Sequence, residues 1–356
     1  MPATSIDTFF ASSLMIILVL SAMVGLSRVL APYVNDFSNE TNVERYRQLS
    51  EYLLLNPGSP QNWGSMFSVV PNGFGLAKQD FSSLYELDID KVSRLNQQNV
   101  YSISYPQLLE SLGISDVALN IELKTIFDIS INLVSSTKEE NETAYNFEVS
   151  TAKSGLPVSS MLRCYVAAKN YVSNLSSSTS SAGIGSINVA IPNSANGTAL
   201  LVVFAKAKVN SQIMSFNVYA FSHNSTSFTP NRTFTQLNPL NYTLNVSFSY
   251  TNEKVLTAQV FSYDYHFNLT QTSNSSQSIE YSIPRLLDAS PMVLIITGFN
   301  ASTYFAEWTS YPQLPTKIGA TFSEDTLRSA IVPFTYVVNI NLVLYRCNIK
   351  CGGPAE

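Results

Sequence analysis

The chain has 356 residues, of which 13% are charged, and its formal net charge is −5. Ordinary soluble domains carry roughly 25% charged residues, so uncharged polar side chains must cover much of this surface. The sequence holds 50 serines, 25 threonines and 31 asparagines. The low basic content argues against nucleic-acid binding. With two histidines, His223 and His266, a metal centre built from several histidines is excluded, and a Ser-His-Asp triad would need one of these two.

The segment Thr8–Ser27 contains no charged residue. A helix of this length, rising 1.5 Å per residue, spans the roughly 30 Å hydrocarbon layer of a membrane. We therefore expect residues 1–35 to form an N-terminal transmembrane or filament-core helix, with residues 8–27 as the membrane partner. A cleaved signal peptide is the alternative, but residues 1–8 contain no Lys or Arg, and no clean small-residue cleavage site follows the apolar run.

The sequence contains eleven N-x-S/T sequons, an excess of less than twofold over the number that this composition gives by chance. Together with the low charge, they predict a glycosylated exterior. We expect the chain beyond about residue 35 to lie outside the cell, either at the cell membrane or in an extracellular filament. The candidate acceptors are Asn39, Asn141, Asn174, Asn196, Asn224, Asn231, Asn241, Asn245, Asn268, Asn274 and Asn300.

Residues 36–115 are predicted to form a helical neck region. Thr41 and Glu44 have the spacing of a capping box, in which side chains satisfy the first free N–H groups of a helix. Apolar residues then recur at helical spacing, as expected for one packing face. These residues are Val43, Tyr46, Leu49, Leu53 and Leu54.

Two shorter helices follow in the neck region. Asp88 is a predicted N-cap, and Asp90 lies in the first turn, where a negative charge suits the helix dipole. Ser104 and Gln107 form a second capping box, and Gly113 is a natural helix end. Asp88 and Asp90 are also candidate metal ligands, but the start of a helix accounts for both.

After Val117 the apolar period changes to two, in successive runs rich in β-branched and aromatic residues. No helical period lies between them, which favours antiparallel sandwiches. The expected fold class is therefore α+β, in which an N-terminal helix and a short helical region precede one or more β-sandwiches. Residues 116–225 would form one sandwich, and residues 226–356 either a second sandwich or a continuation of the first.

Two later segments have an ambiguous composition. Ser173–Ser186 is so rich in serine that it is predicted to be a flexible surface loop. Ala330–Tyr345 is apolar enough to suggest a second membrane span. Its 16 residues are too few, however, and its β-branched content favours a buried strand.

The sequence has three cysteines, which in an exported protein are interpreted first as disulfide partners. Cys164 lies in a strand pattern, and Cys347 and Cys351 end the last one. We expect Cys164 to pair with Cys347 or Cys351, which would stabilise the fold by roughly 2–4 kcal/mol. Cys347 and Cys351 would pair instead if the chain turns between them.

Motifs for enzymatic chemistry are scarce. Asp264 and His266 share a strand face at the spacing of a metal or acid–base pair, but nothing else in the sequence completes such a site. A structural histidine among aromatic neighbours is the simpler interpretation. There is no nucleophile elbow, phosphate loop, zinc-helix motif or calcium loop. The sequence therefore predicts no enzyme and no cofactor.

Several stretches resemble archaeal type IV pilin-like surface proteins. Ser5-Ile6-Asp7 leads directly into the apolar segment. The run LLLNPGSPQNW covers Leu53–Trp63, and GLA follows at Gly75–Ala77. The pattern LDIDKVSRLN…SYPQLLESLGI spans Leu87–Ile114. The resemblance covers about the first 120 residues and the general plan of a β-rich head.

The resemblance implies a short leader that a dedicated peptidase removes, after which the apolar helix is held in the membrane or drawn into a filament. If maturation leaves Ala3 first, Asp7 is the fifth mature residue, the acidic position that pairs with a neighbour's N-terminus in this family. Within the apolar helix, Ser21 and Gly25 are small residues four apart, where helices can approach closely.

Two functions are therefore expected as alternatives. In the first, the chain is a type IV pilin-like filament subunit or minor pilin, which assembles with itself or with other pilin-like subunits and displays a glycosylated β-rich head. In the second, it is a monomeric membrane-anchored extracellular binding or envelope protein. Neither function requires catalysis.

Overall fold

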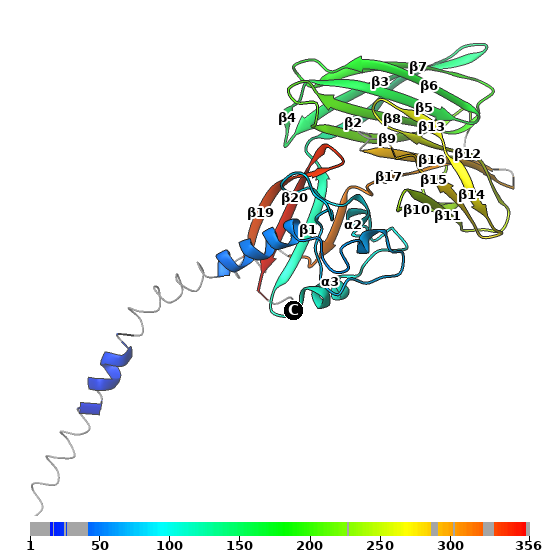
Figure 1. The fold of residues 1–356 in the computed structure, drawn as a ribbon. Coiled ribbons are helices and arrows are strands. Elements are labelled where there is room, and N and C mark those ends of the chain that lie inside the picture. Colours follow the sequence, from blue (N-terminus) through cyan, green and yellow to red (C-terminus); the bar gives the residue numbers. More distant parts are fainter. Residues whose placement is uncertain are drawn as a thin grey trace, which may run out of the picture.

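The structure, a computed structural model, describes residues 15–16, 18–24, 26, 42–225, 228–285, 291–301, 303–322 and 331–353. Strands account for 53% of it and helices for 13%. Within the described residues, twenty strands form five antiparallel sheets of four strands each (Figure 1). Each sheet is named below by one of its strands.

The described helices precede the first strand. In the neck region they are residues 42–55, η1 (Trp63–Ser65), α2 (Ile89–Ser93) and α3 (Tyr105–Leu112). Asp88 caps α2 by accepting from two backbone N–H groups of its first turn. Ser104 and Gln107 form the expected capping box of α3, which ends at Gly113 with a φ of 63°, a conformation that suits glycine. The predicted caps of α2 and α3 are confirmed.

Two sheets pack face to face as a sandwich. Their strands are β2 (Asp128–Lys138), β3 (Glu142–Lys153), β4 (Leu156–Pro157), β5 (Ser160–Ala168), β6 (Tyr171–Ser178), β7 (Ile184–Pro192), β8 (Gly197–Ala207) and β9 (Met214–His223). The β3 sheet has the order β2-β3-β4, with β7 also paired to β3, and the β8 sheet has the order β6-β5-β8-β9. Phe147, Val203 and Phe221 belong to the core that joins them.

Two further sheets lie beneath this sandwich. Their strands are β10 (Thr235–Leu240), β11 (Thr243–Phe248), β12 (Glu253–Phe261), β13 (His266–Asn268), β14 (Thr270–Asn274), β15 (Ser278–Ser282), β16 (Met292–Asn300) and β17 (Thr303–Tyr311). The β16 sheet has the order β13-β12-β16-β17, and the β11 sheet has the order β10-β11-β15-β14. Their facing side chains belong to the largest core cluster, which also contains the apolar residues of the neck region.

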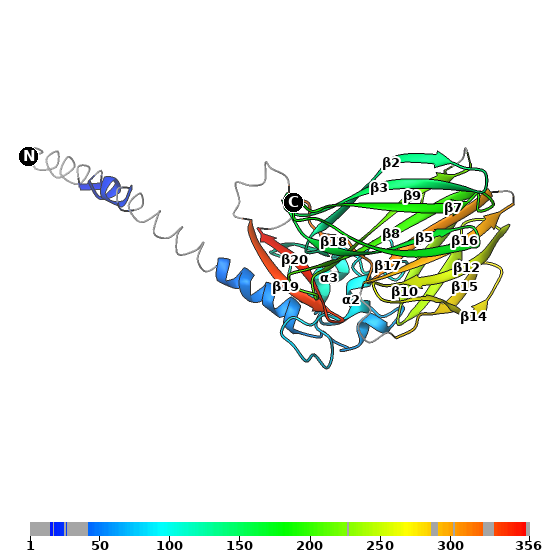
Figure 2. The same ribbon diagram turned by 90° about the horizontal axis from the view of Figure 1, so that it is seen from above.

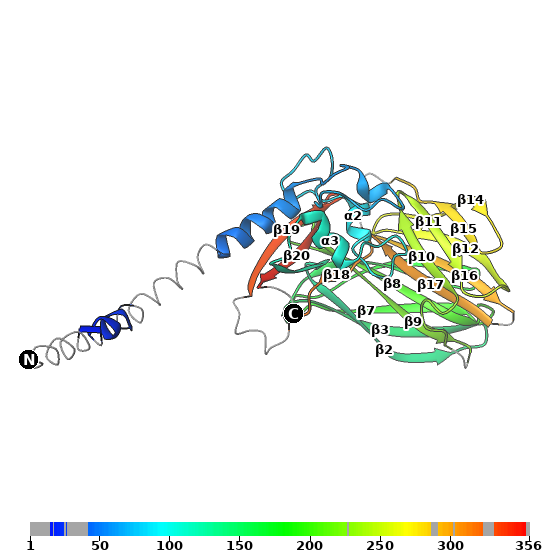
Figure 3. The same ribbon diagram turned by 90° about the horizontal axis from the view of Figure 1, so that it is seen from below.

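The fifth sheet joins the two ends of the described head. Its strands are β1 (Ala118–Thr125), β18 (Thr316–Gly319), β19 (Val332–Ile340) and β20 (Val343–Gly352). In this β20 sheet, the order is β18-β1-β20-β19. Figures 2 and 3 show it beside the helical residues 42–55, at the side of the head from which those residues project.

The first four sheets are stacked in the order β3 sheet, β8 sheet, β16 sheet and β11 sheet (Figure 1). A core cluster that includes Tyr165, Phe204, Val293 and Ile295 fills the space between the β8 and β16 sheets. These two sheets are therefore covered on both faces. This position explains why β8 and β16 are almost continuously apolar rather than alternating.

The predicted α+β fold class is wrong, because the chain is mostly β with five antiparallel sheets in its described part. The capping signals mark real helices, but α2 has five residues and α3 has eight. The strand patterns were interpreted as one or two sandwiches. A local period shows that a strand is buried, but it does not show which distant sheet covers each face.

The predicted transmembrane helix is also corrected. Among the described residues, no helix is both long and apolar enough to cross a membrane. Residues 15–16, 18–24 and 26 are helical. The other residues of the predicted span lie outside the described part of the chain.

Two later segments differ from expectation as well. The serine-rich segment Ser173–Ser186 is not one loop, because it contains most of β6, an edge strand with alternating exposed serines, and the start of β7. Ala330–Tyr345 forms strands as expected, but it is divided between β19 and β20. Asn341 and Leu342, both at positive φ, make the turn between them, as in a two-residue hairpin.

Candidate functional site: the junction between helix and head

The helical residues 42–55 are attached to the head along one face. Tyr46, Leu53 and Leu54 are buried in the largest core cluster, and Leu49 packs against it. Val43 is 41% exposed, so the predicted apolar stripe is correct except at its first member. This packing holds residues 42–55 against the head.

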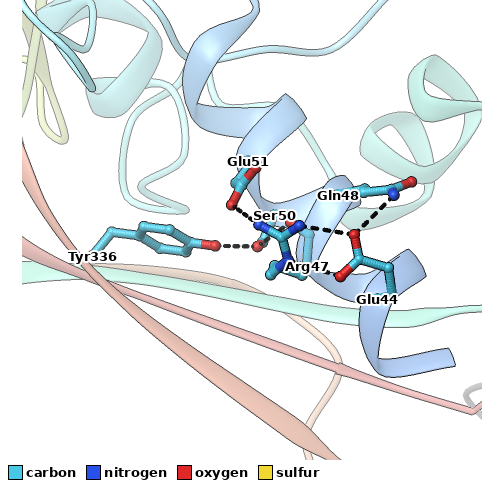
Figure 4. A network of polar contacts seen from close by, with 6 residues as sticks. All are labelled: Glu44, Arg47, Gln48, Ser50, Glu51 and Tyr336. Carbon is cyan, nitrogen blue, oxygen red and sulfur yellow. Dashed lines mark hydrogen bonds and ion pairs between the residues drawn. The ribbon is translucent and has the colours of Figure 1, made fainter. Parts of the chain in front are cut away.

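The outer face of this helix carries a group of charged residues (Figure 4). Arg47 makes two hydrogen bonds to Glu44, at 2.8 and 2.9 Å, and one to Glu51 at 2.8 Å. Gln48 also donates to Glu44 at 3.0 Å. The hydrogen bonds from Arg47 and Gln48 lower the pKa of Glu44 to about 2. These pairs lie one turn apart and support the helical conformation itself.

Two polar contacts connect the helix to distant parts of the head. Ser50 Oγ donates to the carbonyl of Arg47 at 2.8 Å, so the Tyr336 hydroxyl, 2.5 Å away on β19, must donate to Ser50 (Figure 4). Arg45 makes a bidentate ion pair with Asp116, just before β1, at 2.6 and 2.9 Å. The helix is thereby held to both the first sheet strand and an edge strand near the C-terminus.

Two buried cations organise the irregular chain that follows the helix. Lys91 Nζ donates to the carbonyls of Pro57 at 2.8 Å and Ala77 at 2.6 Å. Burial lowers the pKa of Lys91 to about 8 and that of Arg94 to about 10. The Arg94 guanidinium also lies 5.2 Å from the centre of the Trp63 ring. It donates to the carbonyls of Trp63, Met66, Val69 and Tyr101.

Asp90 joins this region to the stacked sheets. Its carboxylate accepts from the Tyr311 hydroxyl at 2.6 Å and from the backbone N–H of Asn241 at 2.8 Å. Burial, with a smaller contribution from Asp88, raises the pKa of Asp90 to about 6. Asp88 serves as the cap, as expected. The role of Asp90 as a link to Tyr311 was missed, because the two residues are 221 positions apart.

The residues proposed for chemistry have structural partners instead. Asp264 lies 3.5 Å from Lys206, and His266 stacks on Phe261 at a centroid distance of 4.6 Å. His223 Nε2 lies 2.9 Å from the carbonyl of Pro192 and must donate to it, so Nδ1 accepts from the Tyr145 hydroxyl at 2.8 Å. Across the described residues, no group of three or more His, Cys, Asp or Glu side chains is arranged to hold a metal.

The predicted disulfide is wrong. Cys164, Cys347 and Cys351 are all free and buried. Cys164 lies in the sandwich core, whereas the other two lie in the core that contains the β20 sheet. Cys347 and Cys351 are four residues apart in one strand, which separates their Cα atoms by about 13 Å, beyond the roughly 7 Å limit for a disulfide. Burial raises the pKa of each thiol to about 12.

The predicted assembly residues are only partly described. Asp7 and Gly25 lie outside the described residues. Ser21 lies on an exposed helical stretch and donates from Oγ to the carbonyl of Leu18 at 2.9 Å. The same stretch exposes large apolar side chains, which are Met15, Ile16, Leu18, Val19, Leu20, Met23, Val24 and Leu26.

The sequons differ in how accessible their asparagines are. The exposed ones are Asn141, Asn174, Asn196, Asn224, Asn241, Asn268 and Asn274. Asn245 and Asn300 are half-buried, and Asn39 lies outside the described residues. Asn231 uses its amide on the Trp308 backbone, which it contacts as donor at 2.9 Å and as acceptor at 2.8 Å. Glycosylation itself remains a prediction.

The comparisons with known proteins assign no family. No protein family matches the chain, and neither does any curated protein. Among solved structures, HBP35 of Porphyromonas gingivalis is 12% identical, with a TM-score of 0.20, over 52% of this chain and 63% of that chain. A chimeric titin Z1Z2–Z1Z2 tandem with a GRGDS peptide from fibronectin is 13% identical, with a TM-score of 0.15. The match covers 51% of this chain and 97% of the titin chain.

The chain thus spans less than two-thirds of the HBP35 chain that it matches. TM-scores this low carry no argument about the fold or the function.

The junction was largely missed in the sequence analysis, because Tyr336 and Asp116 are far in sequence from their partners on the helix. A local signal did exist for Lys91 and Arg94. Both are charged residues within an apolar helical pattern in a chain with few charges.

Proposed function

We propose that this protein is a non-enzymatic, pilin-like subunit of an extracellular filament, which displays its layered β head on the cell surface. The observation that carries the proposal is the run of exposed apolar side chains between Met15 and Leu26, each at least 46% exposed. A soluble monomer gains nothing from such a run, whereas packing against the same segment of other copies would bury it.

The junction supports this proposal. Residues 42–55 are the first described element between the apolar segment and the head. Buried apolar residues, the pair of Arg45 with Asp116 and the hydrogen bond from Tyr336 to Ser50 hold that helix in one orientation. A fixed orientation is what regular packing of identical subunits requires. The resemblance of the N-terminal region to archaeal pilin-like proteins supports the same function.

The non-enzymatic part of the proposal rests on the placement of the reactive groups. His223 is hydrogen-bonded on both ring nitrogens inside the head, and burial lowers its pKa. The pKa of each cysteine thiol is raised to about 12, which leaves little thiolate for nucleophilic chemistry. These groups stabilise the head.

The test is assembly of the full chain in its native host, measured by sedimentation of sheared surface material and electron microscopy. We expect filaments from the wild type and none from Leu18→Asp, because the charge would lie in the packed interface. Leu84→Asp is the matched control, since Leu84 is similarly exposed, at 68% against 61% for Leu18, but lies on the head. A wild type that never sediments, or equal assembly of both variants, would refute the proposal.

A further inference from the structure

A pocket of about 230 Å³ lies where four sheets meet. Its walls come from the end of β1, the start of β2, β9, β17 and the segment after β17, which belong to the β20, β3, β8 and β16 regions of the fold. Sites between packed units are common places for ligands. None of its lining residues makes the contacts of the junction described above, so its function would be separate from assembly.

The pocket has a rigid aromatic wall. Trp308 is half-buried there, and its backbone is fixed by two hydrogen bonds with the Asn231 amide, one donated and one accepted by Asn231. Phe216 and Leu314 also line the pocket. On β9, the Ser215 hydroxyl donates to the carbonyl of Phe127 at 2.7 Å. The neighbouring Asn217 is fixed in the same way to the start of β2. The wall is therefore formed before any ligand arrives.

The polar groups at the rim restrict the ligand. Lys124 forms an ion pair with Glu122 at 3.3 Å. Its ammonium group is therefore a poor partner for a ligand carboxylate. Asp128 is exposed, and the described residues show no hydrogen bond or ion pair to its carboxylate. The available group is thus an acceptor, which suits a neutral ligand with hydroxyl donors.

We propose that this pocket binds one ring of a neutral saccharide, with the C–H face of the ring on Trp308 and its hydroxyl groups donating to Asp128. The pocket volume of about 230 Å³ suits a single sugar ring. Pockets for larger organic ligands typically measure about 300–1,000 Å³. A ring with one apolar face and a polar edge matches a wall of aromatic and aliphatic side chains beside one carboxylate. The inference goes beyond the proposed function and does not depend on filament assembly.

The two tryptophans of the chain provide a direct test. Trp63 is fully buried and Trp308 is half-buried, so acrylamide should quench mainly Trp308 fluorescence. The full chain, in a detergent without a sugar headgroup, is titrated with methyl glycosides of glucose, galactose, mannose and N-acetylglucosamine. We expect at least one glycoside to protect Trp308, with a Kd of about 1 mM for so small a ligand.

Variants assign the binding site. Asp128→Asn should weaken binding about tenfold, since a charged acceptor is lost. Asp80→Asn should leave it unchanged, because Asp80 is an exposed carboxylate outside the pocket. Trp308→Phe should abolish the quenchable signal and so confirm its origin. Absence of protection by every glycoside, protection that Asp128→Asn retains in full, or protection by benzyltrimethylammonium instead would overturn the proposal.

Discussion

Lys91 shows how a single buried charge can organise an irregular chain. Its ammonium group replaces water for two carbonyls, those of Pro57 and Ala77, in a segment that has few regular backbone hydrogen bonds. Buried carbonyls without a partner are costly. A charged side chain is therefore well suited to a core position here, although lysine is rarely found there.

The first prediction concerns this residue. Lys91→Met keeps the apolar stem but leaves both carbonyls unsatisfied, while the desolvation cost of the charge is recovered. We expect a net loss of roughly 2 kcal/mol in the free energy of unfolding, measured by urea denaturation. Lys350→Met is the control, because Lys350 is exposed on β20 and should change stability little. Equal stability of the two variants would contradict this role.

The second prediction concerns the pH dependence of stability. The pKa of Asp90 is raised to about 6 in the folded protein, mainly by burial, whereas an unfolded Asp titrates near 3.9. The folded state therefore binds a proton that the unfolded state releases. The contribution of Asp90 is present below about pH 4 and is lost as the pH rises through about 6. The loss amounts to roughly 3 kcal/mol.

Asp90→Asn isolates this effect. The stability difference between wild type and variant should change by roughly that amount between about pH 4 and pH 7, measured by thermal or urea unfolding. Glu86 acts in the opposite direction. Burial alone would raise its pKa, but hydrogen bonds from Lys78 and Ser82 lower it to about 2. Taking the difference between the two proteins cancels this background. A difference that does not vary with pH would contradict the prediction.

At the scale of elements, sequence patterns succeed where the partners are local. The caps of α2 and α3 were predicted, because each involves residues within one helical turn. The prediction of a loop at Ser173–Ser186 was wrong because it used local composition alone, whereas the strand depends on a partner elsewhere in the chain. The strand β6 forms there because its backbone pairs with β5, and its serines are exposed or half-buried. The contact between Ser50 and Tyr336 spans 286 residues, and no local pattern indicates it.

The third prediction tests how firmly the helix is held to the head. Tyr336→Phe removes the hydroxyl that donates to Ser50, at a cost of about 1 kcal/mol. Amide hydrogen exchange across residues 42–55 should become about fivefold faster, since local opening would be easier. Tyr250→Phe serves as the control, because Tyr250 is 57% exposed and lies elsewhere. Unchanged exchange in Tyr336→Phe would show that apolar packing alone fixes the helix.

At the scale of the whole molecule, the decisive feature is the burial of two sheets on both faces. The sequence analysis placed the runs that become β8 and β16 among its period-two strands, and it had no way to show that these strands cover each other. That contact pairs residues near position 200 with residues near position 295. The C-terminal strand β20 likewise pairs with the first strand, β1. These long-range pairings decide the fold, and they depend on shape and volume rather than on periodicity.

The last prediction follows from this shared core. Because Tyr165, Phe204, Val293 and Ile295 fill one cluster between the β8 and β16 sheets, the layers should unfold together. Differential scanning calorimetry should show one main transition for the head. Ile295→Ala should lower its stability by roughly 2–5 kcal/mol, the usual cost of such a cavity. Ile184→Ala, at a residue 49% exposed on β7, should cost much less.

If the sandwich of the β3 and β8 sheets unfolded independently, Ile295→Ala would produce two transitions. One would move to a lower temperature, and the other would stay at the wild-type temperature. We expect instead that the whole transition moves, because removing the cover from one sheet exposes the apolar face of the other.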